Sequence, residues 1–298
     1  MQVSTWGLES LCALRDLTDA ALPGENLSDD ELLAACFDPA AGSPVVLAEA
    51  SGAGAVALLV ADDDEGRPAA AVSLLAVVPA AQGRGVGRDL LRAAREWAFD
   101  RPGVISLSSG AAGSAGVQLW PGVDVAWTRA LCLFEAAGFG VRETVLNLAC
   151  PTTFRAAPPA GVVVRRALEE DDAAAAVRLC ADLAPRLSGE VARAVEHGSC
   201  LLAVAGEAED KAASAPVGLA CHSVNRVGWT GPVIVSPSWR RQGVGSAVLS
   251  AVCADLRGAG HPDTQISWAE PLEFYARSAG ASVSRVYRRM VYQRDRPR

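Results

Sequence analysis

Residues 77–87 read V-V-P-A-A-Q-G-R-G-V-G, and residues 235–245 read V-S-P-S-W-R-R-Q-G-V-G. Each stretch follows an apolar run of strand type and precedes a run with apolar residues at every fourth position, which is typical of a helix with one buried face. The proline and the last two glycines stand at the same places in both stretches. This shared register indicates an internal duplication of a strand, a glycine-containing turn and a helix.

Length and composition fit a globular protein with two such units. The chain has 298 residues, of which 50% are hydrophobic and 20% charged, and this length suits two domains of about 150 residues. No run of about 18 uncharged apolar residues is present, and the first residues lack the basic start and apolar block of a secretion signal. We therefore expect a cytoplasmic protein without a membrane-spanning segment.

Charge and metal-binding residue types exclude two further classes. The net charge is −7, whereas nucleic-acid-binding proteins usually carry a basic face. The eight cysteines stand singly, and the three histidines are dispersed, so the spacing of a zinc or redox site is missing. The sequence predicts no nucleic-acid partner and no metal.

A linker separates the two copies. Residues 151–161 are rich in proline and show no hydrophobic period, which marks a connecting segment. We therefore predict an N-terminal domain at 1–150, a linker at 151–161 and a C-terminal domain at 162–298.

Hydrophobic periodicity predicts the same order of elements in both halves. In the first half, a capping box of Ser28 and Glu31 opens one helix. Each half is expected to be α+β, a mixed and mostly antiparallel sheet flanked by helices, with one parallel crossover through the helix after the glycine loop. Residues 109–128 look like an insertion of the first half. The expected strands are 2–6, 45–49, 55–60, 70–78, 162–166, 201–205, 217–224, 230–235, 265–268 and 286–293, and the expected helices are 9–20, 28–37, 88–99, 170–183, 190–197, 246–257 and 272–278.

The two loops have the properties of an anion site. A loop that leads directly into a helix presents free backbone N–H groups at the positive end of the helix dipole. Glycines let an anion approach the main chain, and arginines stand in both loops. No Lys-Ser/Thr pair follows, so a nucleoside triphosphate loop is not indicated, and the spacing differs from G-x-G-x-x-G.

These motifs resemble the Q/R-x-x-G-x-G/A loop of the GNAT acyltransferase superfamily, and the chain looks like a tandem member with two GNAT-like domains. The alternative is a pair of tight turns whose glycines serve packing. The resemblance implies that acetyl-CoA is the substrate, its diphosphate on the loops and its pantetheine arm on the strand backbone before each proline. The implied contacts are Val77, Val78, Gln82, Gly83, Arg84, Gly85, Val86, Gly87, Val235, Ser236, Arg240, Arg241, Gln242, Gly243, Val244, Gly245 and Ser246.

The resemblance also suggests where the chemistry lies. Acetyl transfer to an amine requires a deprotonated amine, a polarised thioester carbonyl and a proton for the leaving thiolate. Family members often supply that proton from a tyrosine in the later helix, which implies Tyr275, whereas the first half has Phe134. We therefore predict catalysis in the C-terminal half, with His222 or Glu270 as candidate base. Tyr275 stands one position further from the glycine that follows its helix than Phe134 does, so its register stays open.

Several alternatives remain at this point. The chain could be a non-catalytic acyl-CoA-binding protein, or one half could be a structural partner of an active half. The acceptor is expected to be an amine of a small molecule or a protein, and the molecule a monomer acting as a pseudo-dimer or a homodimer. Four tryptophans could line an acceptor pocket, although core packing is their usual role; they are Trp120, Trp127, Trp229 and Trp268.

Overall fold

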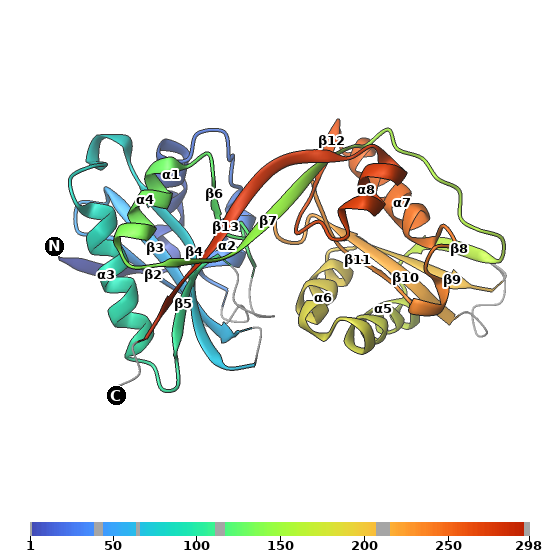
Figure 1. Ribbon diagram of the computed structural model, residues 1–298, viewed down its shortest axis with the longest axis horizontal. Helices are drawn as coiled ribbons and strands as arrows, with labels where there is room; N and C mark the ends of the chain where they lie inside the picture. The colour runs from blue at the N-terminus through green and yellow to red at the C-terminus, as the bar shows by residue number, and fades with distance from the viewer. Residues whose placement is uncertain (1, 39–43, 64–65, 111–116, 207–214, 295–298) are drawn as a thin grey trace. The chain divides into compact units, whose positions relative to one another are not determined.

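The computed structural model describes residues 2–38, 44–63, 66–110, 117–206 and 215–294 (Figure 1). Contacts divide the chain into two compact units. Unit 1 consists of Met1–Val145 with Val286–Arg298, and unit 2 consists of Leu146–Arg285. Both are α+β, which confirms the predicted fold class of two tandem domains.

Unit 1 contains a sheet with the order β1-β2-β3-β4-β5-β13. Its neighbours are antiparallel except for the parallel pair β4 and β5, and the short β6 pairs with β13. The strands are β1 (Val3–Trp6), β2 (Val45–Glu49), β3 (Gly54–Asp62), β4 (Pro68–Val77), β5 (Ser106–Ser109), β6 (Val123–Asp124) and part of β13 (Ser282–Gln293), and the helices are α1 (Leu11–Ala21), α2 (Asp29–Cys36), α3 (Val86–Phe99) and α4 (Thr128–Ala136).

Unit 2 repeats this arrangement with the order β8-β9-β10-β11-β12-β7. Only β11 and β12 are parallel among its described strand pairs. The strands are β8 (Val162–Arg166), β9 (Cys200–Ala205), β10 (Ala215–His222), β11 (Trp229–Val235), β12 (Asp263–Ile266) and part of β7 (Gly140–Pro151), and the helices are α5 (Glu170–Leu183), α6 (Ser188–Glu196), α7 (Val244–Gly258) and α8 (Leu272–Ala279).

The last strand of each sheet comes from the other half of the sequence. In unit 1, β13 pairs with β5 in the register Val291↔Ser108. In unit 2, β7 pairs with β12 in the register Cys150↔Thr264. The contact-based division therefore differs from the sequence division at 1–150, 151–161 and 162–298, because each half gives its final strand to the other unit. That sequence division stays a prediction about which segments fold alone.

Side-chain patterns explain the helices that support the two loops. In α3 the buried stripe is Leu90, Leu91, Ala94 and Ala98, which packs on the sheet core of unit 1. Burying a leucine side chain contributes about 1.5–3 kcal/mol. The helix α7 carries a longer buried stripe of the same kind. Each loop is therefore anchored by a helix that is fixed on its sheet.

The predicted capping box is present. Ser28 donates its backbone N–H to Glu31 Oε2 at 2.7 Å, and the Glu31 N–H donates to Ser28 Oγ at 3.2 Å. Together these bonds satisfy two amides at the start of α2, which fixes where this helix begins. In the described part of the chain, no helix is long and apolar enough to span a membrane.

Candidate functional site

The loop between β4 and α3 presents free backbone amides. After the 3-10 turn Pro79–Ala81, Gly83 and Gly85 adopt φ values of 74° and 91°, and Gly85 caps α3. The first helical hydrogen bond is donated by Asp89 to the Gly85 carbonyl at 3.0 Å. The amides at 86–88 therefore have no partner within the helix, and they lie at its positive end.

The loop between β11 and α7 has the same backbone. Gly243 caps α7 with a φ of 92°, and Ala247 donates the first helical hydrogen bond to its carbonyl at 3.0 Å. Arg241 takes the place of Gly83 and adopts a φ of 63°. A left-handed conformation costs a residue other than glycine about 1–2 kcal/mol. The second loop therefore adopts the same backbone conformation as the first loop despite that cost.

Next to each loop, the two parallel strands separate. The pairing of β4 with β5 ends at Val72 and Ser109, and Gly110 adds one last hydrogen bond to the Val72 carbonyl at 2.9 Å. Strand β4 nevertheless continues to Val77. In unit 2 the pairing of β11 with β12 ends at Thr230 and Ile266, and β11 continues to Val235. Among the residues that the structure describes, both units therefore leave one strand edge unpaired beside the loop.

A bulge decides which peptide groups face that open edge. Ser73 has no partner in β3, because Ala57 pairs with Leu74 while Leu58 pairs with Val72. The Val78 N–H donates to the Ala53 carbonyl at 2.9 Å on the β3 side. Peptide groups alternate along a strand, so those of Val77 and Leu75 face the opening.

The predicted main-chain contacts are therefore placed differently. Val78 and Ser236 both donate their N–H to the neighbouring antiparallel strand, and their carbonyls accept hydrogen bonds from the following turn. The peptide groups that face each cleft belong to Leu75 and Val77, and by the same alternation to Val233 and Val235. Leu75 and Val233 were not predicted, since the sequence gives no sign of the bulge.

The first motif residue folds back onto the strand in both units. Gln82 donates Nε2–H to the Val77 carbonyl at 3.0 Å, and Arg240 donates Nε–H to the Val235 carbonyl at 3.2 Å. In unit 1 the Arg129 guanidinium then donates to Gln82 Oε1 at 2.9 Å. Arg129, at the start of α4, is thus tied to the loop and was missed by the sequence analysis.

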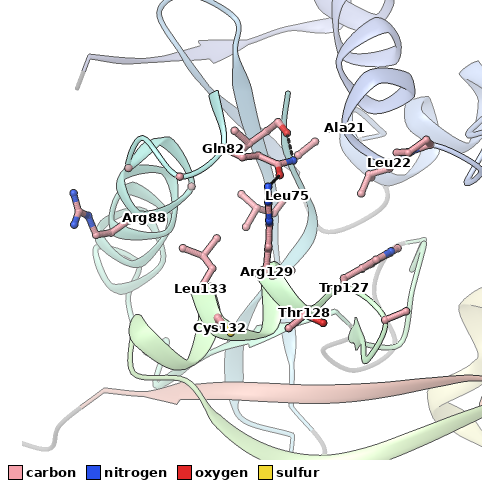
Figure 2. A pocket seen from close by; sticks show the side chains of 18 residues that line it. Ala21, Leu22, Leu75, Gln82, Arg88, Trp127, Thr128, Arg129, Cys132 and Leu133 are labelled. Carbon is pink, nitrogen blue, oxygen red and sulfur yellow. Dashed lines mark hydrogen bonds between the residues drawn. The ribbon is translucent and has the colours of Figure 1, made fainter. Parts of the chain in front are cut away.

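These elements enclose a cavity of about 1100 Å³ in unit 1. Figure 2 shows Arg88 on one side of the Gln82–Arg129 pair, and Leu22 and Trp127 on the other. The predicted residues Val77, Gln82, Gly83, Gly85 and Gly87 line it. The other lining residues are Ala21, Leu22, Pro23, Leu75, Ala76, Arg88, Ala126, Trp127, Thr128, Arg129, Ala130, Cys132 and Leu133.

The last glycine of each loop permits close approach of the next helix. A Cβ atom on Gly87 would lie 2.9 Å from Leu133 Cδ2, and one on Gly245 would lie 3.0 Å from Phe274 Cζ. Leu133 and Phe274 are therefore equivalent, and the residues that follow them, Phe134 and Tyr275, are both buried. This equivalence resolves the register that the sequence left open.

Tyr275 lies in the core of unit 2. Its side chain is 6% exposed and packs in the cluster that contains Leu148, Leu249 and Ile266. Within the described ranges its hydroxyl makes no hydrogen bond, and burial raises the pKa of Tyr275 to about 12. The phenol is therefore protonated at neutral pH, and its role as an acid stays a prediction.

The two candidate bases lie in different surroundings. His222 is at the end of β10, opposite Thr230, and its Nε2 lies 3.4 Å from Asp255 Oδ2. Burial lowers the pKa of His222, and Asp255 partly opposes that shift. Glu270 is exposed just before α8. Val235, which lies next to the loop, pairs with Gly218, and Gly218 is four positions along β10 from His222, about 13 Å. The structure therefore does not bring His222 to the loop.

The four tryptophans have different surroundings. Trp127 is half-buried and lines the cavity, and Trp120 packs edge-on against it with ring centroids 5.3 Å apart. Trp229 lies beside Arg226, and Trp268 is 39% exposed. Part of the expected insertion, residues 111–116, lies outside the described residues.

Known proteins agree with this architecture. The family model of the acetyltransferase (GNAT) family matches residues 11–118 and 152–280. The chain therefore belongs to the GNAT family, with one GNAT region in each half, which confirms the resemblance. It is accordingly an acetyltransferase-family protein of the tandem type. No curated protein matches the chain significantly.

Solved structures share the fold over nearly the whole chain. A tandem GNAT protein from the clavulanic acid biosynthesis pathway has a TM-score of 0.71 at 18% identity, over 98% of each chain. A GCN5-related N-acetyltransferase from Sphaerobacter thermophilus has a TM-score of 0.67 at 20% identity, over 98% of this chain and 95% of that one. The glucosamine N-acetyltransferase region of a fungal multi-domain β-N-acetylglucosaminidase has a TM-score of 0.74 at 18% identity, and the match spans 98% of this chain but 38% of that protein.

Proposed function

We propose that this protein is an acetyl-CoA-dependent N-acetyltransferase and that acetyl-CoA binds in the cavity of unit 1. The observation that carries the proposal is the cavity of about 1100 Å³ that runs from the loop amides to the open edge of β4. The acceptor is an amine of a small molecule or a protein. The name of the fungal relative includes glucosamine, which makes an amino sugar one acceptor to test.

The residues present fit acetyl-CoA as a substrate. The amides at 86–88 and the Arg88 side chain offer donors and positive charge for a diphosphate. No side chain obstructs Gly83, where an added Cβ atom would meet nothing within 4 Å. The peptide groups of Leu75 and the N–H of Val77 can bind an extended amide-containing arm in the way that a strand edge binds a peptide.

In the proposed reaction the amine nitrogen attacks the thioester carbonyl carbon. The new C–N bond forms, the C–S bond breaks, the amine loses its proton, and CoA leaves as a thiolate that is then protonated. The peptide N–H groups of the cleft would polarise the carbonyl. A thiolate with a pKa of about 8.5 leaves without a strong acid, so Phe134 in this half does not prevent transfer.

Matched substitutions at equivalent positions test which cleft is used. Arg88 and Ser246 hold the same place at the start of α3 and α7. Arg88→Glu puts a carboxylate against the diphosphate, and we expect acetyl-CoA binding and turnover to fall about 10- to 100-fold, since bonds to charged groups are worth about 1.5–3 kcal/mol. Calorimetry with acetyl-CoA and thiol-release assays with an amine panel measure both. Ser246→Glu should leave turnover unchanged, and the reverse pattern would contradict the proposal.

A second candidate places transfer in unit 2, because Tyr275 carries a phenol at the position that Phe134 occupies in unit 1. If Tyr275 protonates the leaving thiolate, Tyr275→Phe should slow turnover about 10²-fold, within the range of general acids. Phe134→Tyr is the reciprocal variant in unit 1. An unchanged rate in Tyr275→Phe, measured by thiol release, would remove Tyr275 from the mechanism and leave the cleft of unit 1 as the site.

Calorimetric stoichiometry separates the remaining alternatives. Two equivalents of acetyl-CoA per chain would exclude a purely structural half. Tight binding of acetyl-CoA without thiol release for any amine would instead favour a non-catalytic acyl-CoA-binding protein.

A further inference from the structure

The cavity of unit 1 has two chemically different ends. At one end lie the glycine loop and Arg88 (Figure 2). Beyond the Gln82–Arg129 pair, the wall is formed by residues without charge, Ala21 and Leu22 from the end of α1 and Trp127 before α4. A charged phosphate group therefore matches only the first end.

The apolar end has a firmly supported aromatic wall. Trp127 is half-buried, and its backbone N–H donates to the Asp124 carbonyl at 2.9 Å. Behind it, Trp120 packs edge-on, and the Trp120 indole N–H donates to Glu25 Oε2 at 3.0 Å. The indole of Trp127 is thus held in place by a second ring, and that ring is fixed by a hydrogen bond. Leu22 supplies an aliphatic surface in the same cavity.

The charges on the cavity wall disfavour acceptors that carry a carboxylate or phosphate and acceptors that carry a second ammonium group. The charged side chains among the described lining residues are Arg88 and Arg129, and Arg129 is bonded to Gln82. Near Trp127 a carboxylate or phosphate on the acceptor would find only the Arg129 guanidinium, which already donates to Gln82. The described lining residues offer no carboxylate to a second ammonium group. An aromatic face, in contrast, favours apolar area and attracts an incoming ammonium.

We propose that the acceptor site of unit 1 takes a primary amine on a small apolar body, with an arylalkylamine as the best match, bound between Leu22 and Trp127. This inference rests on the proposed function, because it names the acceptor of the same cleft. It also makes a claim about binding that does not depend on turnover.

The test is a calorimetric titration of the full chain with three amines, 2-phenylethylamine, ethanolamine and glucosamine, each without acetyl-CoA. We expect 2-phenylethylamine to bind at least about tenfold more tightly than the other two, since apolar pockets discriminate by about this factor for one methylene group. Trp127→Ala and Leu22→Ser should each weaken its binding at least about fivefold. Equal affinities for the three amines, or no binding of 2-phenylethylamine, would overturn the proposal.

Matched controls keep the result specific. Trp97→Ala removes a half-buried tryptophan of unit 1 that stacks on Arg101, and Leu33→Ser removes an exposed leucine of α2. Neither lines the cavity, so both should bind 2-phenylethylamine as the parent does. If Trp127→Ala fails to fold, Leu22→Ser carries the test, and unchanged binding in that variant would overturn the proposal.

A parallel titration with acetyl-CoA distinguishes failure of the proposed amine site from failure of the proposed acetyltransferase function. Acetyl-CoA binding without a preference for 2-phenylethylamine over ethanolamine and glucosamine would overturn this inference but not the proposed function. Binding of 2-phenylethylamine that depends on Trp127, in a chain that does not bind acetyl-CoA, would support the apolar amine site and overturn the acetyltransferase.

Discussion

At the residue scale, the loop motif shows why glutamine and arginine can alternate at its first position. Gln82 and Arg240 differ in size and charge, yet each donates an N–H to the carbonyl of the last residue of its strand. An amide and a guanidinium share that donor and little else. The requirement at this position is therefore a donor that turns back to the strand, and the charge of Arg240 is incidental to that bond.

His222 should make stability depend on pH. Its pKa is lowered, mainly by burial and against the effect of Asp255. Because the folded pKa is below the unfolded value of about 6.5, the unfolded chain binds the proton more readily. This contribution is fully present above about pH 6.5 and is lost as the pH falls through the lowered folded pKa. We expect urea midpoints to drop between pH 7.5 and pH 5.5, and to drop less in His222→Gln.

The exposed His197 on the surface after α6 provides the matched control for that measurement. His197→Gln should retain the pH dependence of the parent. A parent-like drop in His222→Gln would show that His222 is not its source.

At the element scale, much of the fold follows from local patterns. Each strand and helix that periodicity and the capping box predict is present in the structure. Three of them have the predicted bounds: Val45–Glu49, Val162–Arg166 and Glu170–Leu183. The glycine loops were also found, because their free amides depend on the local chain. The bulge at Ser73 was not found, since it results from pairing with β3, and it moved the open peptide groups from Val78 to Leu75.

Cavity walls that come from distant elements were also beyond sequence reasoning. Leu22 and Arg129 line the cavity because the end of α1 and the start of α4 both border it, and nothing in their local sequence marks them. Trp127 was only one of four candidate tryptophans. Such residues are identified by tertiary contacts between elements, which the local hydrophobic periodicity of the sequence does not predict.

The segment before β6 should tolerate no added side chain. A Cβ atom on Gly122 would lie 2.6 Å from the backbone oxygen of Arg288 in β13, and backbone cannot rotate away as a side chain can. We expect Gly122→Ala to lower the free energy of unfolding by about 1–3 kcal/mol, the usual cost of overpacking. Denaturant unfolding measures it.

Gly140 at the start of β7 is the control, because an added Cβ atom there would meet nothing within 4 Å. Gly140→Ala should change the free energy of unfolding by less than about 0.5 kcal/mol. Equal effects of the two substitutions would mean that β13 does not approach Gly122 this closely.

At the scale of the whole molecule, each unit depends on a strand from the other half of the sequence. Residues of β13 contribute fully buried side chains to unit 1, Tyr287 and Met290 among them. Their pairing also covers the edge of β5. A segment ending at residue 150 therefore lacks part of the core and one strand of the sheet that it would need to fold alone.

A chain that ends at Ala281 should show this dependence. It loses the two fully buried side chains of Tyr287 and Met290, each worth about 1.5–3 kcal/mol, from a unit whose total stability is of the order of 5–15 kcal/mol. We expect a lower unfolding temperature and faster hydrogen exchange of the β5 amides, partly restored by adding a peptide of residues 282–294. A chain ending at Arg294 is the control, and exchange at β5 that is equally slow in both chains would contradict the prediction.

The place of β13 beside β5 also has a consequence for synthesis on the ribosome. Translation delivers the N-terminus first, but the sheet that contains β1 receives its outermost strand from residues 286–293. The nascent first half must therefore wait, with an unprotected edge, until residues 286–293 have been synthesised. Unit 1 is therefore expected to complete its folding only after the segment of unit 2 has been made, and chaperones that shield open strand edges should matter most during that interval.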